Sequence, residues 1–116
     1  MRKFLLSFVF AWNGIRHGII VERNAKLHLL ATIIVISAGV LTGLSQYEWF
    51  IILILIGGML ALEMMNSAVE RVVDLATDIR HPLAKQAKDL AAGAVLIYAM
   101  ISALIGMIIF LPKWFN

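Results

Sequence analysis

Cysteine is absent from the sequence, proline occurs only twice, and charged residues make up 15% of the 116 residues. Without cysteine the chain has no disulfide framework, no thiolate metal site and no thiol nucleophile. Soluble domains are usually about 25% charged and about 45–50% apolar, whereas this chain is 62% apolar. These values exclude a soluble catalytic domain and indicate one small domain, residues 1–116, embedded in lipid.

The common phosphate-binding loops are also missing. Neither G-x-x-x-x-G-K-[ST] nor G-x-G-x-x-G occurs, and the signatures of protein kinases are absent. If the chain transfers a phosphoryl group, catalysis must therefore come from positioning, from a metal ion held by carboxylates, and from a lysine.

Long runs without charge dominate what the sequence does contain. Residues 27–47 and 90–111 carry no Asp, Glu, Lys or Arg, and each run matches the roughly 20 residues that cross a hydrocarbon core of about 30 Å. The uncharged run at 49–62 is shorter, so its helix must continue through Glu63 to cross. We therefore predict an all-α membrane protein with three transmembrane helices, at about 27–47, 49–70 and 90–111.

The N-terminal segment, about residues 2–21, has a different character. Apolar residues recur at helical spacing on one side, whereas Lys3, Ser7 and His17 fall on the other; the apolar residues are Phe4, Leu5, Phe8, Trp12, Ile15 and Ile19. An amphipathic helix that is too charged to cross the bilayer lies in the plane of the interface. We predict such a surface helix here, although an amphipathic helix packed on the bundle would show the same pattern.

Lysine and arginine are distributed unevenly around the predicted spans. Nine of the ten precede the first span or lie between the second and third spans, and only Lys113 follows the third span. Positively charged loops stay in the cytoplasm. We therefore expect the N-terminus on the cytoplasmic side and the C-terminus on the outer side.

A stripe of polar residues runs along the second predicted span and its extension. Glu63, Asn66, Glu70 and Asp74 follow one another at spacings of three, four and four, so with Ser67 they share an arc of about 100° on a helix. A carboxylate at the centre of a membrane helix costs about 2.5–3.5 kcal/mol, and such groups usually face a bundle interior or a cavity. The stripe is therefore predicted to face away from lipid and to mark a functional site.

The acidic side chains of the stripe need partners on the same side of the membrane. The residues that could supply them are Glu22, Arg23, Asn24, Lys26, His28, His81, Lys88 and Asp89. Carboxylates at this density suit Mg²⁺, which proteins often hold with carboxylates together with substrate phosphates. A magnesium site of this kind indicates nucleotide chemistry. The three histidines are individually weak candidates for metal ligands; they are His17, His28 and His81.

Three alternatives remain open on the residues alone. Glu70 and Asp74 could pair with cations to solvate a helix end, the cations being Arg71, Arg80 or Lys88. Glu63 could serve a small proton-coupled transporter, although a transporter needs one carboxylate near the midplane rather than a cluster near one interface. The chain could also be a non-catalytic helical partner of a larger enzyme. That alternative does not explain why the carboxylates cluster near one interface.

Several strings match a known family. EMMNSAVERVVDL at 63–75, AKD at 87–89 and AAGAVLI at 91–97 resemble the small bacterial membrane kinases that comprise diacylglycerol kinase and undecaprenol kinase. W-x-G-x-R at 12–16 and Glu22 extend the resemblance over nearly the whole chain. Two further strings, ERNAKLH and HPLAKQAKDLAAGAV, resemble the undecaprenol kinase branch of Gram-positive bacteria.

The resemblance implies roles for individual residues. Glu63 would be the catalytic base, with Asn66 a polar active-site residue beside it. Glu22 and Glu70 would hold Mg²⁺. The residues implied on the nucleotide side are Glu70, His81, Lys88 and Asp89.

The resemblance also implies an activity and an assembly. The chain would use ATP and Mg²⁺ to phosphorylate a membrane lipid alcohol, with undecaprenol favoured over diacylglycerol. It would act in the bacterial cytoplasmic membrane, with its active site on the cytoplasmic side. A homotrimeric helical bundle with active sites shared between subunits is implied, and nucleic acid is not an expected partner.

Overall fold

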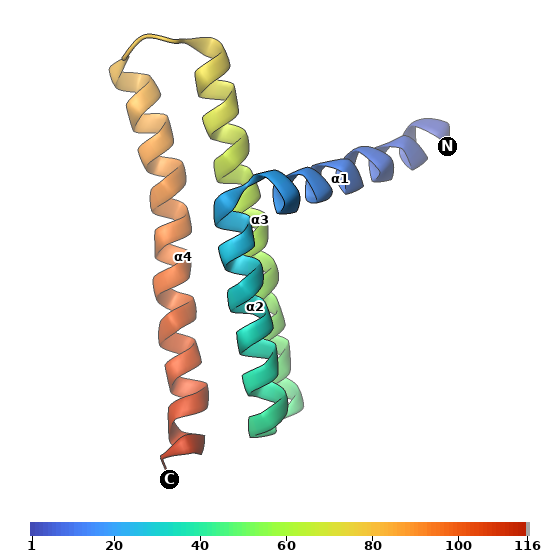
Figure 1. Ribbon diagram of the computed structural model, residues 1–116, viewed down its shortest axis with the longest axis vertical. Coiled ribbons are helices and arrows are strands. Elements are labelled where there is room, and N and C mark those ends of the chain that lie inside the picture. Colours follow the sequence, from blue (N-terminus) through green and yellow to red (C-terminus); the bar gives the residue numbers. More distant parts are fainter. Residues whose placement is uncertain (116) are drawn as a thin grey trace.

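Four helices account for almost all of residues 1–115, which the computed structural model describes. They are α1 (Arg2–Val21), α2 (Arg23–Thr42), α3 (Gln46–Ala76) and α4 (Pro82–Trp114), and no strand occurs within 1–115. Helices α2, α3 and α4 pack side by side as a bundle, whereas α1 leaves the bundle and points away from it (Figure 1). The predicted all-α fold is confirmed.

Helix α2 ends at Thr42, short of the predicted end at residue 47. Gly43 adopts a left-handed conformation with φ of 80°, which glycine reaches without a steric cost and which commonly ends a helix. Ser45 then starts α3, because its hydroxyl accepts a hydrogen bond from the Glu48 N–H and the Glu48 carboxylate accepts one from the Ser45 N–H. This reciprocal capping fixes the turn between α2 and α3.

Helix α4 continues past the predicted end at residue 111 and includes Pro112. A proline in a helix removes one N–H donor, but other contacts hold this last turn. The indole Nε1 of Trp114 donates to Thr42 Oγ1 at 2.8 Å, and Lys113 Nζ lies 3.1 Å from Glu48 Oε1. The end of α4 is therefore fastened to both α2 and α3.

The opposite ends of α3 and α4 project beyond the level of α1 and are joined by a short loop (Figure 1). His81 begins α4, because its Nδ1 accepts a hydrogen bond from the Leu83 N–H at 3.1 Å. Pro82 follows at the first helical position, where its missing N–H costs nothing. The long α3 thus reaches from the apolar bundle to the polar end of the molecule.

The apolar core lies near the end of the bundle that holds the C-terminus. Ile52, Ile109 and Phe110 are buried there, and Val35 and Trp49 pack against them. Most other large apolar side chains are exposed. By length and composition all four helices could cross a membrane, including α1, which we expected from the sequence to be too charged to do so. Lipid can cover such apolar surfaces.

A single glycine permits close packing of α3 on α4. The Tyr98 hydroxyl donates to the carbonyl oxygen of Ile54 at 2.9 Å. A Cβ atom on Gly58 would overlap that hydroxyl and lie 2.5 Å from Tyr98 Cζ. Small residues at such crossings let helix backbones approach closely in membranes.

We predict that Gly58→Ala destabilises the bundle, because the new methyl group would displace the Tyr98 ring. The expected loss is about 1–3 kcal/mol, as for other overpacked cores. Gly57→Ala is the matched control, since nothing lies within 4 Å of a Cβ at Gly57. Thermal unfolding in detergent compares the two variants, and equal midpoints would contradict the assigned packing.

Candidate active site

The deep end of the polar stripe on α3 is turned into the protein. Glu63 is 4% exposed, and Asn66 and Ser67 are both buried. Glu70 and Asp74, which lie nearer the loop between α3 and α4, are exposed instead. The stripe is therefore buried at its deep end and open at the end near the loop.

Glu63 meets a histidine from α2. Nε2 of His28 lies 3.4 Å from Oε2 of Glu63, and the two side chains are 26% and 5% exposed. The Thr32 hydroxyl donates to the His28 carbonyl oxygen at 2.8 Å. Sequence reasoning included His28 only among several possible partners, although it is the one titratable residue of α2 beyond Lys26.

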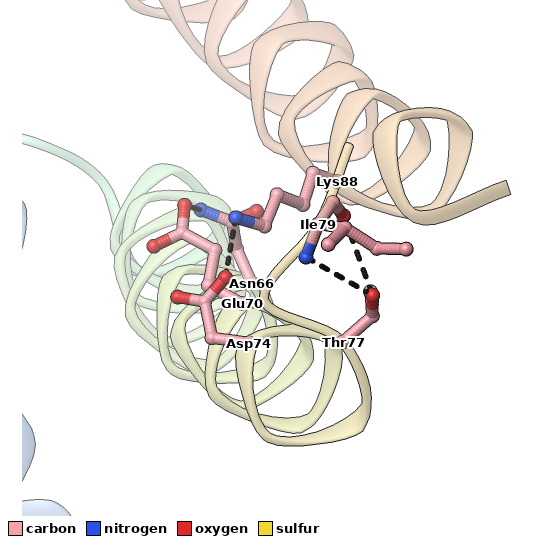
Figure 2. Close-up of polar contacts among 6 residues, drawn as sticks. All are labelled: Asn66, Glu70, Asp74, Thr77, Ile79 and Lys88. Carbon is pink, nitrogen blue, oxygen red and sulfur yellow. Dashed lines mark hydrogen bonds and ion pairs between the residues drawn. The ribbon is translucent and has the colours of Figure 1, made fainter. Parts of the chain in front are cut away.

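Asn66 links the buried and exposed halves of the stripe (Figure 2). Its Nδ2 donates to Glu70 Oε1 at 3.4 Å. Its Oδ1 is buried and meets no donor among the described residues. A buried polar atom without a partner is costly, so this oxygen is available to a ligand or to another chain.

Lys88 reaches across from α4 to the exposed end of the stripe (Figure 2). Its Nζ lies 2.6 Å from Asp74 Oδ1. This hydrogen bond raises the pKa of Lys88 above its ordinary value, with desolvation opposing and the charges of Asp74 and Glu70 adding to the rise. Lys88 is therefore a fixed cation beside two carboxylates, and the predicted pairing alternative is confirmed for Asp74.

A groove of about 910 Å³ lies where α3 and α4 meet their connecting loop. This is within the range of small-molecule sites. Polar and charged side chains line it, among them Asp74, Arg80, His81, Lys85, Lys88 and Asp89. The groove thus brings together three of the residues predicted on the nucleotide side, while Asp89 itself pairs along α4 with Lys85 at 2.6 Å.

Glu22 lies apart from this groove, at the junction of α1 and α2. Its carboxylate pairs with Arg71, whose Nη2 also lies 3.2 Å from His17 Nε2. The suggestion that Arg71 pairs with Glu70 or Asp74 is therefore corrected. Arg71 contacts the helix junction because it lies on a different side of α3 from the stripe.

The metal ligands predicted from the resemblance were Glu22 and Glu70. Within residues 1–115, no group of three or more His, Cys, Asp and Glu side chains is placed to hold a metal ion. Mg²⁺ commonly binds through one or two carboxylates, with waters and substrate phosphates completing its shell. The oxygen donors of Glu22 and Glu70 suit that chemistry, so these roles stay predictions.

A second cavity, of about 310 Å³, lies lower in the bundle between α2, α3 and α4. Its walls are mostly apolar, and His28 stands at the level of Glu63; other lining residues are Val35, Ile56, Ser102, Gly106 and Phe110. The Ser102 hydroxyl is buried and finds no partner in the described chain. A mostly apolar cavity therefore adjoins His28, the residue that contacts the buried acid.

Comparison with known proteins decides between the remaining functional classes. Residues 9–110 match the family model described as prokaryotic diacylglycerol kinase. The chain belongs to this family. As a prokaryotic diacylglycerol kinase family member with several long apolar helices, it is a multi-pass membrane protein and a lipid kinase. Membership favours phosphoryl transfer over both the proton-coupled transporter and the non-catalytic partner.

Three relatives carry related names. The undecaprenol kinase of Bacillus subtilis (strain 168) is 52% identical over 113 residues, which cover 97% of this chain and 92% of that protein. The diacylglycerol kinase of Synechocystis sp. is 37% identical over 95% of this chain, which spans 63% of that protein. The diacylglycerol kinase of Helicobacter pylori (strain J99) is 34% identical over 78% of this chain and 70% of that protein.

We predict that Arg71→Ala loosens the junction between α1 and α2, because Arg71 contacts both His17 and Glu22. Amide hydrogen exchange of residues 17–25 should become about tenfold faster. Lys85→Ala serves as the control, since it removes an ion pair within α4 alone. Unchanged exchange in Arg71→Ala would show that the junction is held by other contacts.

Proposed function

We propose that this lipid kinase uses ATP and Mg²⁺ to phosphorylate the hydroxyl of undecaprenol. The observation that carries the proposal is the arrangement along α3, where one stripe runs from the buried carboxylate of Glu63 to Asp74 in a groove lined by charged side chains. The buried end suits a lipid hydroxyl and the exposed end suits a charged nucleotide. Undecaprenol is preferred over diacylglycerol because the relative that matches best in identity and coverage among the three is named undecaprenol kinase.

Each residue of the stripe has a defined task in this proposal. The Glu63 carboxylate takes the proton from the lipid hydroxyl as general base. Asn66, whose Oδ1 is free to accept a hydrogen bond within the described chain, orients the groups around that hydroxyl. Because α3 is continuous through both residues, their spacing relative to Glu70 is fixed.

The nucleotide side rests on α4 and its loop. Lys88 contacts the phosphates as a cation, and its hydrogen bond to Asp74 raises its pKa still further above neutral pH. His81 and Asp89 line the same groove and contact the rest of the nucleotide. Glu22 and Glu70 hold Mg²⁺, which when bound neutralises charge on the transferring phosphoryl group.

Two of these residues are already engaged in the chain alone. Glu22 pairs with Arg71, and Lys88 pairs with Asp74. To hold Mg²⁺, Glu22 would have to leave Arg71, and to contact the phosphates, Lys88 would share its charge between them and Asp74. Exposed ion pairs contribute little stability, so little stability is lost when Lys88 shares its charge between Asp74 and the phosphates.

We place α2, α3 and α4 across the bacterial cytoplasmic membrane and α1 along its cytoplasmic surface. The apolar side chains of α1 are largely exposed and the helix points away from the bundle, as suits a helix in the interface. The positive charge before α2 and around the α3–α4 loop favours the cytoplasm for that end. The apolar cavity below His28 would receive part of the lipid chain.

The assembly proposed for this chain is a homotrimer with shared active sites. One chain of three thin spans leaves Glu70 and Asp74 exposed, whereas ligand sites usually bury most of their ligand. Residues from a second copy would complete the walls of the site. The unpartnered oxygen of Asn66 is consistent with such a contribution.

We predict that Glu63→Gln abolishes turnover while nucleotide binding stays intact, because the amide cannot take a proton. The loss should be about 10²–10⁴-fold or more, measured with labelled ATP and lipid in nanodiscs. Glu48→Gln is the matched control, since Glu48 lies at the other end of α3 and pairs with Lys113. Retained turnover in Glu63→Gln would remove this mechanism.

We predict that the enzyme prefers undecaprenol to diacylglycerol by at least about tenfold in kcat/KM. The same nanodisc assay, run with each lipid alcohol separately, measures this ratio. A preference for diacylglycerol would overturn the proposed acceptor but leave the lipid kinase activity in place.

A further inference from the structure

Glu63 has little access to water. Its side chain is 5% exposed, and Asn66 and Ser67, one turn further along α3, are buried as well. Phosphorylation of an alcohol by ATP releases one proton for each phosphate transferred. A buried base that accepts this proton must lose it again before the next turnover, so a route from Glu63 to water is needed.

His28 is placed at the start of such a route. It is the ionisable side chain that contacts Glu63 within residues 1–115, at 3.4 Å between Nε2 and Oε2. Its own side chain is 26% exposed, about five times the exposed fraction of Glu63. The imidazole therefore touches the buried acid and is also open to its surroundings.

The location of His28 in α2 suits transfer of a proton toward the polar end of the molecule. It lies six residues from Glu22, about 9 Å along the helix, where α1 leaves the bundle (Figure 1). Asn66, the polar side chain that links Glu63 to the groove, carries an amide that does not exchange protons near neutral pH, whereas an imidazole does. The histidine is thus the better proton carrier of the two.

We propose that His28 is a positioning residue that relays the catalytic proton from Glu63 to water; this inference rests on the proposed function. As the lipid oxygen bonds to phosphorus, its O–H bond breaks and the proton passes to the Glu63 carboxylate, while ADP leaves with the electron pair of the broken P–O bond. The Glu63 carboxyl group then gives the proton to Nε2 of His28. The imidazolium passes it to water, which restores both residues.

Two substitutions test the relay. His28→Ala should lower kcat about 100-fold, a value typical of positioned proton-transfer groups, because the proton stays on Glu63. The KM for ATP should stay within about twofold, since His28 does not line the groove proposed for the nucleotide. Added imidazole should restore turnover in His28→Ala by occupying the space of the missing ring.

His28→Gln separates proton relay from hydrogen bonding. Glutamine is close in size and can still donate to Glu63, but it cannot carry the proton. Its kcat should therefore fall as in His28→Ala, and imidazole should not restore it because the site is filled. If His28→Ala does not assemble, His28→Gln alone decides, and wild-type turnover in it overturns the relay.

A second histidine supplies the control for imidazole. His17 contacts Arg71 and not Glu63, so imidazole should not stimulate His17→Ala. A kcat for His28→Ala close to that of the wild type, or a loss that imidazole does not restore, overturns the relay. If Glu63→Gln is inactive in that case, the proposed kinase mechanism still stands; if Glu63→Gln is active, the mechanism itself fails.

Discussion

The arrangement of the polar half of this protein depends on one constraint, which is the cost of a carboxylate inside a membrane helix. A carboxyl group in a low-dielectric interior is tolerated only where a nearby group pairs with its negative charge or hydrogen-bonds to its protonated form. Glu63 on α3 is such a carboxyl group, and His28 on α2 is the side chain that pairs with it. The contact requires that these faces of α2 and α3 meet. Asn66 and Ser67, one turn further along α3, are buried as well.

The two ends of the bundle are held by different forces. At the end near the C-terminus, apolar packing around Ile52 and Phe110 is supported by the bond from Trp114 to Thr42. At the other end, the contacts are ion pairs between side chains that are largely exposed, such as Lys88 with Asp74. Such contacts exchange easily with water and ligands. The chain therefore has one end held by apolar packing and one end whose contacts can rearrange.

The helices and the polar stripe could be predicted from local sequence, because hydropathy and the 3.6-residue period depend on neighbours in the chain. The ends of α2 and α4 were less predictable. The uncharged run continues past Gly43, where backbone conformation ends the helix, and the contacts of Trp114 carry α4 beyond Pro112. The partners of Arg71 were missed because charge alone favours its neighbours in sequence, whereas helix packing places it beside Glu22. Family membership came from strings of residues rather than from any of these contacts.

The unbroken course of α3 from Gln46 to Ala76 has a consequence for how such a chain can vary. Each added residue advances a helix by 1.5 Å and turns it by about 100°. A single insertion between Glu63 and Glu70 would therefore rotate the rest of α3 about the helix axis. Asp74 would then no longer face Lys88. Only changes of whole turns preserve the phase of the helix, and these alter its length instead. Length variation in this protein is consequently tolerated best outside α3, as in the turn at 43–45 and the loop at 77–81.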